Sequence, residues 1–252
     1  MLVRLDTSTS GVQYRDAEPW PHIVLDDVIS ADVAAAIVAE AATVPPSSLD
    51  RQLSRRQQKL TLNKLDELGP VTGEVLRELN SPVAVDFLKS VTGITSLVSD
   101  PTFCRAGLFV TPPGGWQRIH EDFRLHPHTN LWNRVIMLLY CSEWDSTWGG
   151  ELEMWPLDMV KVGARIEPRR GRMVIFEATR SHRHGIRVIE PHASPRVVLA
   201  SRHYSAEPPN ETPSPRILTW SRRPNERLRD VLPTVSEVLR ELRERRQRVS
   251  DR

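Results

Sequence analysis

The sequence predicts a mostly β protein with flanking helices, whose core is an all-β barrel or a sandwich of two sheets. From about residue 103 onward, short apolar runs recur, divided by Gly, Pro and Asn, and this spacing is typical of such cores. Helical patterns precede these runs, and another follows them. The 252 residues suffice for one large domain or two small ones. We expect a single domain over 1–252: a strand and helical buttress (1–102), the β core (103–206), and a loop with a closing helix (207–252).

The N-terminal part predicts one strand and three helices. The run PWPHIVLDDVIS at 19–30 favours a strand that ends in a turn. Ser30 is placed to cap the Ala-rich helix that follows it. Two amphipathic helices are expected at 68–81 and 81–93, the second with a first-turn proline and a closing glycine. The polar segment VPPSSLDRQLSRRQQK at 44–59 predicts an exposed loop.

The β core is predicted from about eight apolar runs with tight connections between them. They are TFCRAGLFVT, WQRIHEDF, NRVIMLLYCS, GGELEMW, ARIEP, GRMVIFEA, HGIRVIE and PRVVLASRHYS. The chain then becomes helical again after a Pro-rich connection, because four apolar residues share one helical face. Those residues are Val235, Val238, Leu239 and Leu242.

Charge and cysteine content exclude several classes of protein. The 34 basic and 32 acidic residues leave a net charge of +2, which favours neither a nucleic-acid nor a membrane-surface partner. Cys104 and Cys141 lie in apolar runs, so buried thiols in a reducing compartment are expected rather than a disulfide framework. No signal-like apolar stretch opens the sequence, and no run approaches the roughly 20 apolar residues of a membrane span. We therefore expect a cytoplasmic protein.

The segment WQRIHEDF contains a pair of candidate metal ligands. Residues i and i+2 of a strand point to the same face, so His120 and Asp122 would face together and Glu121 would point away. The pair needs a third ligand from a distant strand, and both His182 and His184 are available. Strand alternation alone does not choose between them. Two histidines and one carboxylate with open positions form the ligand set of non-haem Fe(II) oxygenases.

An oxygenase of this type usually needs a co-substrate that supplies electrons. If that co-substrate is a dicarboxylate, the site needs a cation at a fixed distance from the metal. Arg196 begins an apolar strand after the histidines, and an arginine fork can pair a carboxylate through two hydrogen bonds. Arg202 is a rival, because its even spacing from Arg196 places both on one face.

Several segments, in this order, resemble the 2-oxoglutarate- and Fe(II)-dependent oxygenases, specifically the prolyl 4-hydroxylase-like branch. They include EPWPHIVLDDVISADVAAAIVAE, SPVAVDFLKSVTGITSLVSDP, PGGWQRIHEDFRLHP, NRVIMLLYCSEWDSTWGGELEMW, RIEPRRGRMVIFEATRSHRHGI and PRVVLASRHY. The resemblance implies a double-stranded β-helix core, also called a jelly-roll or cupin-like fold. It implies Fe(II), 2-oxoglutarate and O2 as cofactors, His120 and Asp122 as proximal metal ligands, His184 as the distal ligand, and Arg196 as the partner of the 2-oxoglutarate distal carboxylate.

Departures from the family pattern concern the substrate. Arg124 stands where many relatives have asparagine, and Arg183 stands where they often have tryptophan. Candidate pocket residues are Trp116, Arg124, His126, Arg134, Arg183 and Arg202, and the arginines around the metal pair favour an acidic substrate. Asp122 favours hydroxylation, since related halogenases carry a small residue at that position.

We therefore expect a hydroxylase that acts on a small molecule derived from a natural product or an amino acid, with release of succinate and CO2. The substrate could also be bound to a carrier or a peptide. The alternatives are a peptidyl-prolyl hydroxylase, a non-catalytic cupin-like binding protein, and a zinc hydrolase with the same ligands. The sequence does not indicate an oligomeric state.

Overall fold

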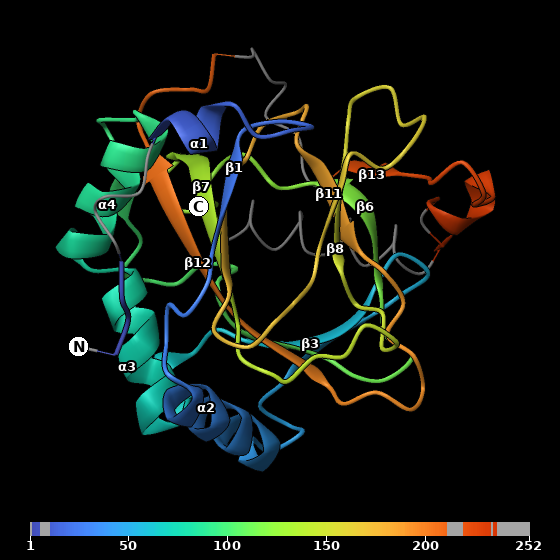
Figure 1. Ribbon diagram of the computed structural model, residues 1–252, viewed down its shortest axis with the longest axis horizontal. Helices are drawn as coiled ribbons and strands as arrows, with labels where there is room; N and C mark the ends of the chain where they lie inside the picture. The colour runs from blue at the N-terminus through green and yellow to red at the C-terminus, as the bar shows by residue number, and fades with distance from the viewer. Residues whose placement is uncertain (1, 6–10, 211–218, 233, 236–252) are drawn as a thin grey trace.

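In the computed structural model, two antiparallel sheets face each other, and helices cover the outside of the larger one (Figure 1). The structure describes residues 2–5, 11–210, 219–232 and 234–235. Within them, the larger sheet has the order β1-β10-β7-β12-β5-β3-β2, with β4 paired to β12, and the smaller has the order β13-β6-β11-β8-β9. The mostly β, jelly-roll core is thus confirmed.

The bounds of the elements follow the apolar runs closely. The larger sheet contains β1 (His22–Leu25), β2 (Asp50–Leu53), β3 (Gln58–Leu62), β4 (Val98–Ser99), β5 (Gly107–Thr111), β7 (Trp132–Tyr140), β10 (Met173–Glu177) and β12 (Arg196–Ser205). The smaller contains β6 (Gln117–Glu121), β8 (Leu152–Trp155), β9 (Ala164–Ile166), β11 (Arg183–Ile186) and β13 (Thr219–Ser221). The helices are α1 (Gly11–Arg15), α2 (Ala31–Thr43), α3 (Pro70–Leu79) and α4 (Pro82–Thr92), with 3₁₀ turns η1 (Leu65–Glu67) and η2 (Leu228–Asp230).

Two of the three predicted helices, α2 and α4, have the caps that the sequence indicates. The Ser30 hydroxyl accepts a hydrogen bond from the Val33 N–H (3.3 Å) at the start of α2. Gly93 ends α4 in the left-handed region (φ 76°), where its N–H reaches the Lys89 carbonyl. No helix among the described residues is long and apolar enough to cross a membrane.

The main core lies between the helices and the outer face of the larger sheet. Leu76 and Leu88 of the helices are fully buried there with Leu139 and Leu199 of the central strands. The preceding residue of β12, Val198, points to the opposite face, into a second cluster with Phe176. Strand alternation therefore gives β7 and β12 one face for the helical layer and one for the space between the sheets.

The segment 44–59 is not the exposed loop that its polarity predicts. Its second half forms β2 and the start of β3, a hairpin that extends the larger sheet beyond β5. The prediction was wrong because the inward face of this hairpin is polar and lines a cavity, so its strands lack the apolar side that sequence patterns detect.

The structure differs from the expected elements at the start of β5, and it describes little of the expected C-terminal helix. The run that begins at Thr102 becomes a strand only from Gly107, because the Asp100 carboxylate holds residues 102–104 in a turn through the N–H groups of Thr102 and Cys104. Most of the expected C-terminal helix, including Val238, Leu239 and Leu242, lies outside the described residues.

Candidate metal centre and its cavity

Three candidate metal ligands meet where β6 lies beside β11. His120 and His184 are directly opposite each other in the antiparallel register, so both side chains leave the same face of the smaller sheet, with ring centroids 4.4 Å apart. Asp122 comes two residues after His120 and reaches the same face. One ligand atom from each of the three buried residues lies within 4.8 Å of the others.

Backbone carbonyls set the orientation of both imidazoles. His120 Nδ1 lies 3.0 Å from the Arg118 carbonyl oxygen, and His184 Nδ1 lies 3.1 Å from that of His182. A carbonyl only accepts, so each Nδ1 carries a proton and each Nε2 is the ring nitrogen left to ligate a metal. The Nε2 of His120 also lies 3.3 Å from the side-chain nitrogen of Gln117. Burial lowers the pKa of His120 to about 3, which keeps this ring neutral and able to ligate.

The Asp122 carboxylate completes a donor set that fits a divalent metal. Its Oδ1 accepts a hydrogen bond from Arg202 Nη2 (3.0 Å), and its Oδ2 faces His184 Nε2 at 3.3 Å. Burial alone would raise the pKa of Asp122, but Arg202, His184 and His120 together hold it well below its ordinary value. A cation between Asp122 Oδ2 and His184 Nε2 would be favourable, because both atoms can present a lone pair to it. Two imidazoles and one carboxylate form the facial set that Fe(II) prefers.

Arg196, at the start of β12, lines the same cavity as the three ligands. It is buried, and its guanidinium lies over the Tyr140 ring, 4.7 Å from the centroid. Its Nε is a buried donor without a hydrogen-bond partner in the described part of the chain. A buried guanidinium with an unsatisfied donor fits the distal carboxylate of a dicarboxylate co-substrate.

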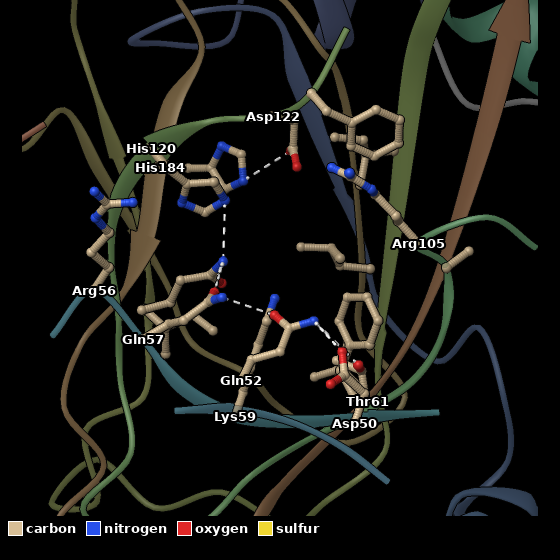
Figure 2. Close-up of a pocket in the computed structure, with 18 of the residues that line it drawn as sticks. Asp50, Gln52, Arg56, Gln57, Lys59, Thr61, Arg105, His120, Asp122 and His184 are labelled. Carbon is tan, nitrogen blue, oxygen red and sulfur yellow. Dashed lines mark hydrogen bonds and ion pairs between the residues drawn. The ribbon is translucent and has the colours of Figure 1, made fainter. Parts of the chain in front are cut away.

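The cavity has a volume of about 460 Å³ and is shared by both sheets (Figure 2). Apolar side chains of the larger sheet form one part of its wall, among them Phe109, Leu138, Phe176 and Val198. Trp220 of β13 packs against His120, with ring centroids 5.2 Å apart. The three candidate ligands are therefore buried at the wall of a ligand-sized cavity.

His182 and His184 were both candidates for the third ligand, and they have different surroundings in the structure. His184 joins the ligand cluster, whereas His182 stacks on Trp20, with centroids 4.6 Å apart. The His182 Nδ1 also lies 2.6 Å from the Glu177 carbonyl oxygen. In this arrangement His182 supports the packing beside β10.

Of the six candidate pocket residues, Arg202 lines the cavity, where it is bound to Asp122. Arg124 and Arg183 instead donate to the two oxygens of Glu121, on the opposite face of β6. Glu121 therefore points away from the candidate ligands, as expected. The positive charges of Arg124 and Arg183, which favoured an acidic substrate, are paired with Glu121 and do not line the cavity.

The other three candidates also lie outside the cavity lining. Arg134 pairs with Glu177 (2.7 Å) beyond the end of the core. His126 is buried in a turn against Asp100 (3.4 Å). Trp116 lines a separate surface hollow on the outer side of the hairpin.

The residues that sequence reasoning missed come from the β2–β3 hairpin and from β13. The inward-facing hairpin residues are Asp50, Gln52, Gln57, Lys59 and Thr61. Their side-chain amides form a chain that begins at the metal site: Gln117 donates to Gln57 (3.2 Å) and Gln57 donates to Gln52 (2.9 Å), as Figure 2 shows. The signal that could have found them is the period of two in DRQL and QKLTL, which puts alternate polar residues on one face.

Comparisons with known proteins agree with this site. Residues 106–202 match the family model of the 2OG-Fe(II) oxygenase superfamily. No curated protein sequence matches the chain.

Solved structures share the fold. A Pseudomonas putida prolyl-4-hydroxylase aligns over 78% of this chain and 98% of its own, with 16% identity and a TM-score of 0.55. A Trichoplax adhaerens prolyl hydroxylase, solved with a peptide fragment of the hypoxia inducible factor oxygen degradation domain, aligns over 79% and 89%, with 16% identity and a TM-score of 0.55. A Burkholderia pseudomallei oxidoreductase of the 2OG-Fe(II) oxygenase family aligns over 81% and 91%, with 16% identity and a TM-score of 0.52.

The matched segment contains all three candidate ligands and Arg196. The family implies Fe(II), 2-oxoglutarate and O2 as cofactors, and the donor set fits the metal. Residues 106–202 of this chain therefore match the 2OG-Fe(II) oxygenase superfamily, and the chain shares its fold with prolyl 4-hydroxylases; together these findings support a dioxygenase.

Proposed function

We propose that this dioxygenase hydroxylates a small molecule, and that His120, Asp122 and His184 hold its iron. The observation that supports the proposal is that these ligands and the buried Arg196 line one cavity. The same proposal treats residues 1–252 as one domain, since α3 packs directly on β12 of the core.

Each residue has a defined task in this proposal. The carbonyl-bound imidazoles and Asp122 present three lone-pair donors in a fixed geometry. Arg202 neutralises the outer oxygen of Asp122, and Arg196 binds and orients the distal carboxylate of 2-oxoglutarate. When bound, iron, 2-oxoglutarate and O2 supply the oxidation of a substrate C–H bond to C–OH, with release of succinate and CO2. The apolar wall and Trp220 exclude water from the site.

The size of the cavity and the attachment of the hairpin to β6 support a small substrate. The turn of the hairpin is bonded to β6, because the Gln58 N–H donates to the Trp116 carbonyl and the Arg118 N–H donates to the Arg56 carbonyl, each at 2.8 Å. Arg56 Nε also donates to the Val231 carbonyl (3.1 Å), which brings the C-terminal segment over this turn. The cavity volume is that of sites that enclose small ligands.

Peptidyl-prolyl hydroxylation is the second candidate. It is favoured by the shared fold with two proteins described as prolyl hydroxylases, one of them with a bound peptide fragment. Turnover that requires a proline-containing peptide and is absent with small substrates would select this candidate over the first.

The central experiment measures conversion of 2-oxoglutarate to succinate with Fe(II) and O2. We expect turnover that requires Fe(II) and is abolished in His120→Ala. Metal binding without 2-oxoglutarate binding in calorimetry would instead indicate a cupin-like binding protein. A hydrolytic activity that requires zinc and does not depend on Arg196 would indicate a zinc hydrolase.

A further inference from the structure

Lys59 is a cation that the proposed reaction does not use. It is 9% exposed and lines the cavity from β3. Figure 2 shows it projecting toward the middle of the cavity, on the side opposite Asp122. Among the residues that the structure describes, it forms no ion pair, and its Nζ lies over the Phe109 ring, 4.7 Å from the centroid.

The two other buried cations of the cavity lining have different roles. Arg202 is paired with Asp122 at 3.0 Å. Arg196 is the proposed partner of the co-substrate. An additional buried ammonium without a counter-ion is unfavourable, because burial disfavours the charged form. Burial lowers the pKa of Lys59 to about 8, so the side chain is still mostly protonated at neutral pH.

Lys59 and Arg196 occupy separate positions in the cavity wall. Arg196 pairs with Thr111 of β5, whereas β3 pairs with the other edge of β5. The two cations therefore extend from strands on opposite sides of β5. Because Lys59 and Arg196 come from opposite sides of β5, each can bind a different carboxylate. The cavity wall therefore offers two positions for anions.

The surroundings of Lys59 suit an organic anion with polar neighbouring groups. Gln52 lies directly across the hairpin from Lys59. Its amide is fixed by Gln57 (2.9 Å) and by Thr61 Oγ1 (3.3 Å). A row of oriented amides beside a single ammonium offers hydrogen bonds as well as one positive charge. One ammonium that forms no ion pair within the described part of the chain can bind one carboxylate.

We propose that Lys59 binds a carboxylate of the organic substrate, so that the enzyme acts on a small carboxylic acid. The assignment of this carboxylate to the substrate rests on the proposed function, in which Arg196 serves 2-oxoglutarate. The anion site itself rests on Lys59, Gln52 and the cavity. The amide row then orients the acid so that its remaining atoms extend toward the candidate metal centre.

The test measures binding of matched acids and amides to protein loaded with Zn(II) and 2-oxoglutarate. The probes are benzoate with benzamide, and N-acetylglycine with N-acetylglycinamide, titrated by calorimetry. We expect each acid that binds to do so at least about tenfold more tightly than its amide, since a charge-assisted hydrogen bond contributes on the order of 1.5–3 kcal/mol. Lys59→Gln should remove this preference, and Lys59→Arg should restore part of it.

Matched variants separate the site from general charge effects. Lys64→Gln removes the same charge from an exposed position, where Lys64 pairs with Glu67 (2.6 Å), and should keep the preference for acids. Lys59→Met provides a second variant in case the glutamine is poorly accommodated. Equal binding of acids and amides, a preference that survives in both Lys59 variants, or no acid binding at up to about 10 mM would each overturn the proposal.

The outcomes also separate this inference from the proposed function. If Lys59→Gln weakens 2-oxoglutarate binding more than Arg196→Gln does, Lys59 serves the co-substrate and the inference is wrong. If acids bind through Lys59 but the wild type shows no iron-dependent succinate formation, the anion site is supported and the proposed function is wrong.

Discussion

The β6–β11 wall and the β2–β3 hairpin face each other across one cavity, and they differ in how their charges are balanced. On the first wall, Asp122 is paired with Arg202, and Glu121 on the opposite face is paired with two arginines. On the hairpin, Lys59 points into the cavity without an ion-pair partner among the described residues. A wall with balanced charges can hold its ligands in place before anything binds. A wall with an unbalanced charge gains most from binding an anion.

The largest expected effect on activity comes from removing a candidate metal ligand from the β6–β11 wall. In His184→Ala the metal loses one of three donors, so we expect iron-dependent succinate formation to fall by at least about 10³-fold, equivalent to roughly 4 kcal/mol. His182→Ala is the matched control, because His182 lies two residues away and stacks on Trp20. Comparable losses of turnover in both variants, with both folded by circular dichroism, would contradict the placement of His184 in the metal centre.

Removing the unbalanced charge should stabilise the hairpin wall. Burial lowers the pKa of Lys59 from 10.5 to about 8, so keeping the ammonium charged in the folded state costs about 3 kcal/mol at pH 7. Lys59→Met should therefore raise the free energy of unfolding at pH 7 by up to about that amount. The charged groups around Lys59 are Asp122, Arg202, Arg196 and Asp50.

The pH dependence gives the sign of this effect. Between about pH 8 and pH 10.5 the folded wild type has released the Lys59 proton while the unfolded chain still holds it, so wild-type stability rises with pH. The gap between Lys59→Met and wild type should be largest at neutral pH and close by about pH 10.5 in urea unfolding. A gap that stays constant over this range would show that the Lys59 charge does not cause it.

Changing Arg196 tests the link between the two walls. Arg196→Gln removes a buried guanidinium from the cavity, and we expect the KM for 2-oxoglutarate to rise roughly 10- to 100-fold through the loss of a charge-assisted pair. Arg187→Gln is the control, since Arg187 pairs with Glu151 (2.8 Å) and its side chain is 46% exposed. An unchanged KM in Arg196→Gln would assign 2-oxoglutarate to another cation of the cavity.

The smallest expected effect concerns Trp220, which packs on a ligand without donating to the metal. Trp220→Ala should weaken Co(II) affinity by up to about tenfold, because an aromatic contact contributes on the order of 0.5–1.5 kcal/mol to the position of His120. Trp220→Phe should retain most of the affinity. Equal weakening in both variants would show that the contact acts through the backbone of β13.

The sequence predicted those parts of the site that depend on local periodicity. A spacing of two in a strand placed His120 and Asp122 on one face and turned Glu121 away, because the β pleat does not depend on distant residues. The capping residues Ser30 and Gly93 likewise specified helix ends through contacts within one turn. The polar hairpin was missed, because its buried face carries Gln52 and Lys59 where a buried strand normally carries apolar residues.

What the sequence determined by itself was therefore the strand pattern of the core, the placement of His120 and Asp122 on one strand face, and the resemblance to a family. Only the tertiary structure decided between His182 and His184, because that choice depends on the register between β6 and β11, which lie more than 60 residues apart in the chain. It also decided which arginines reach the cavity. Each long charged side chain pairs with whatever acid the fold brings near it, and Glu121 draws Arg124 and Arg183 to the far side of β6.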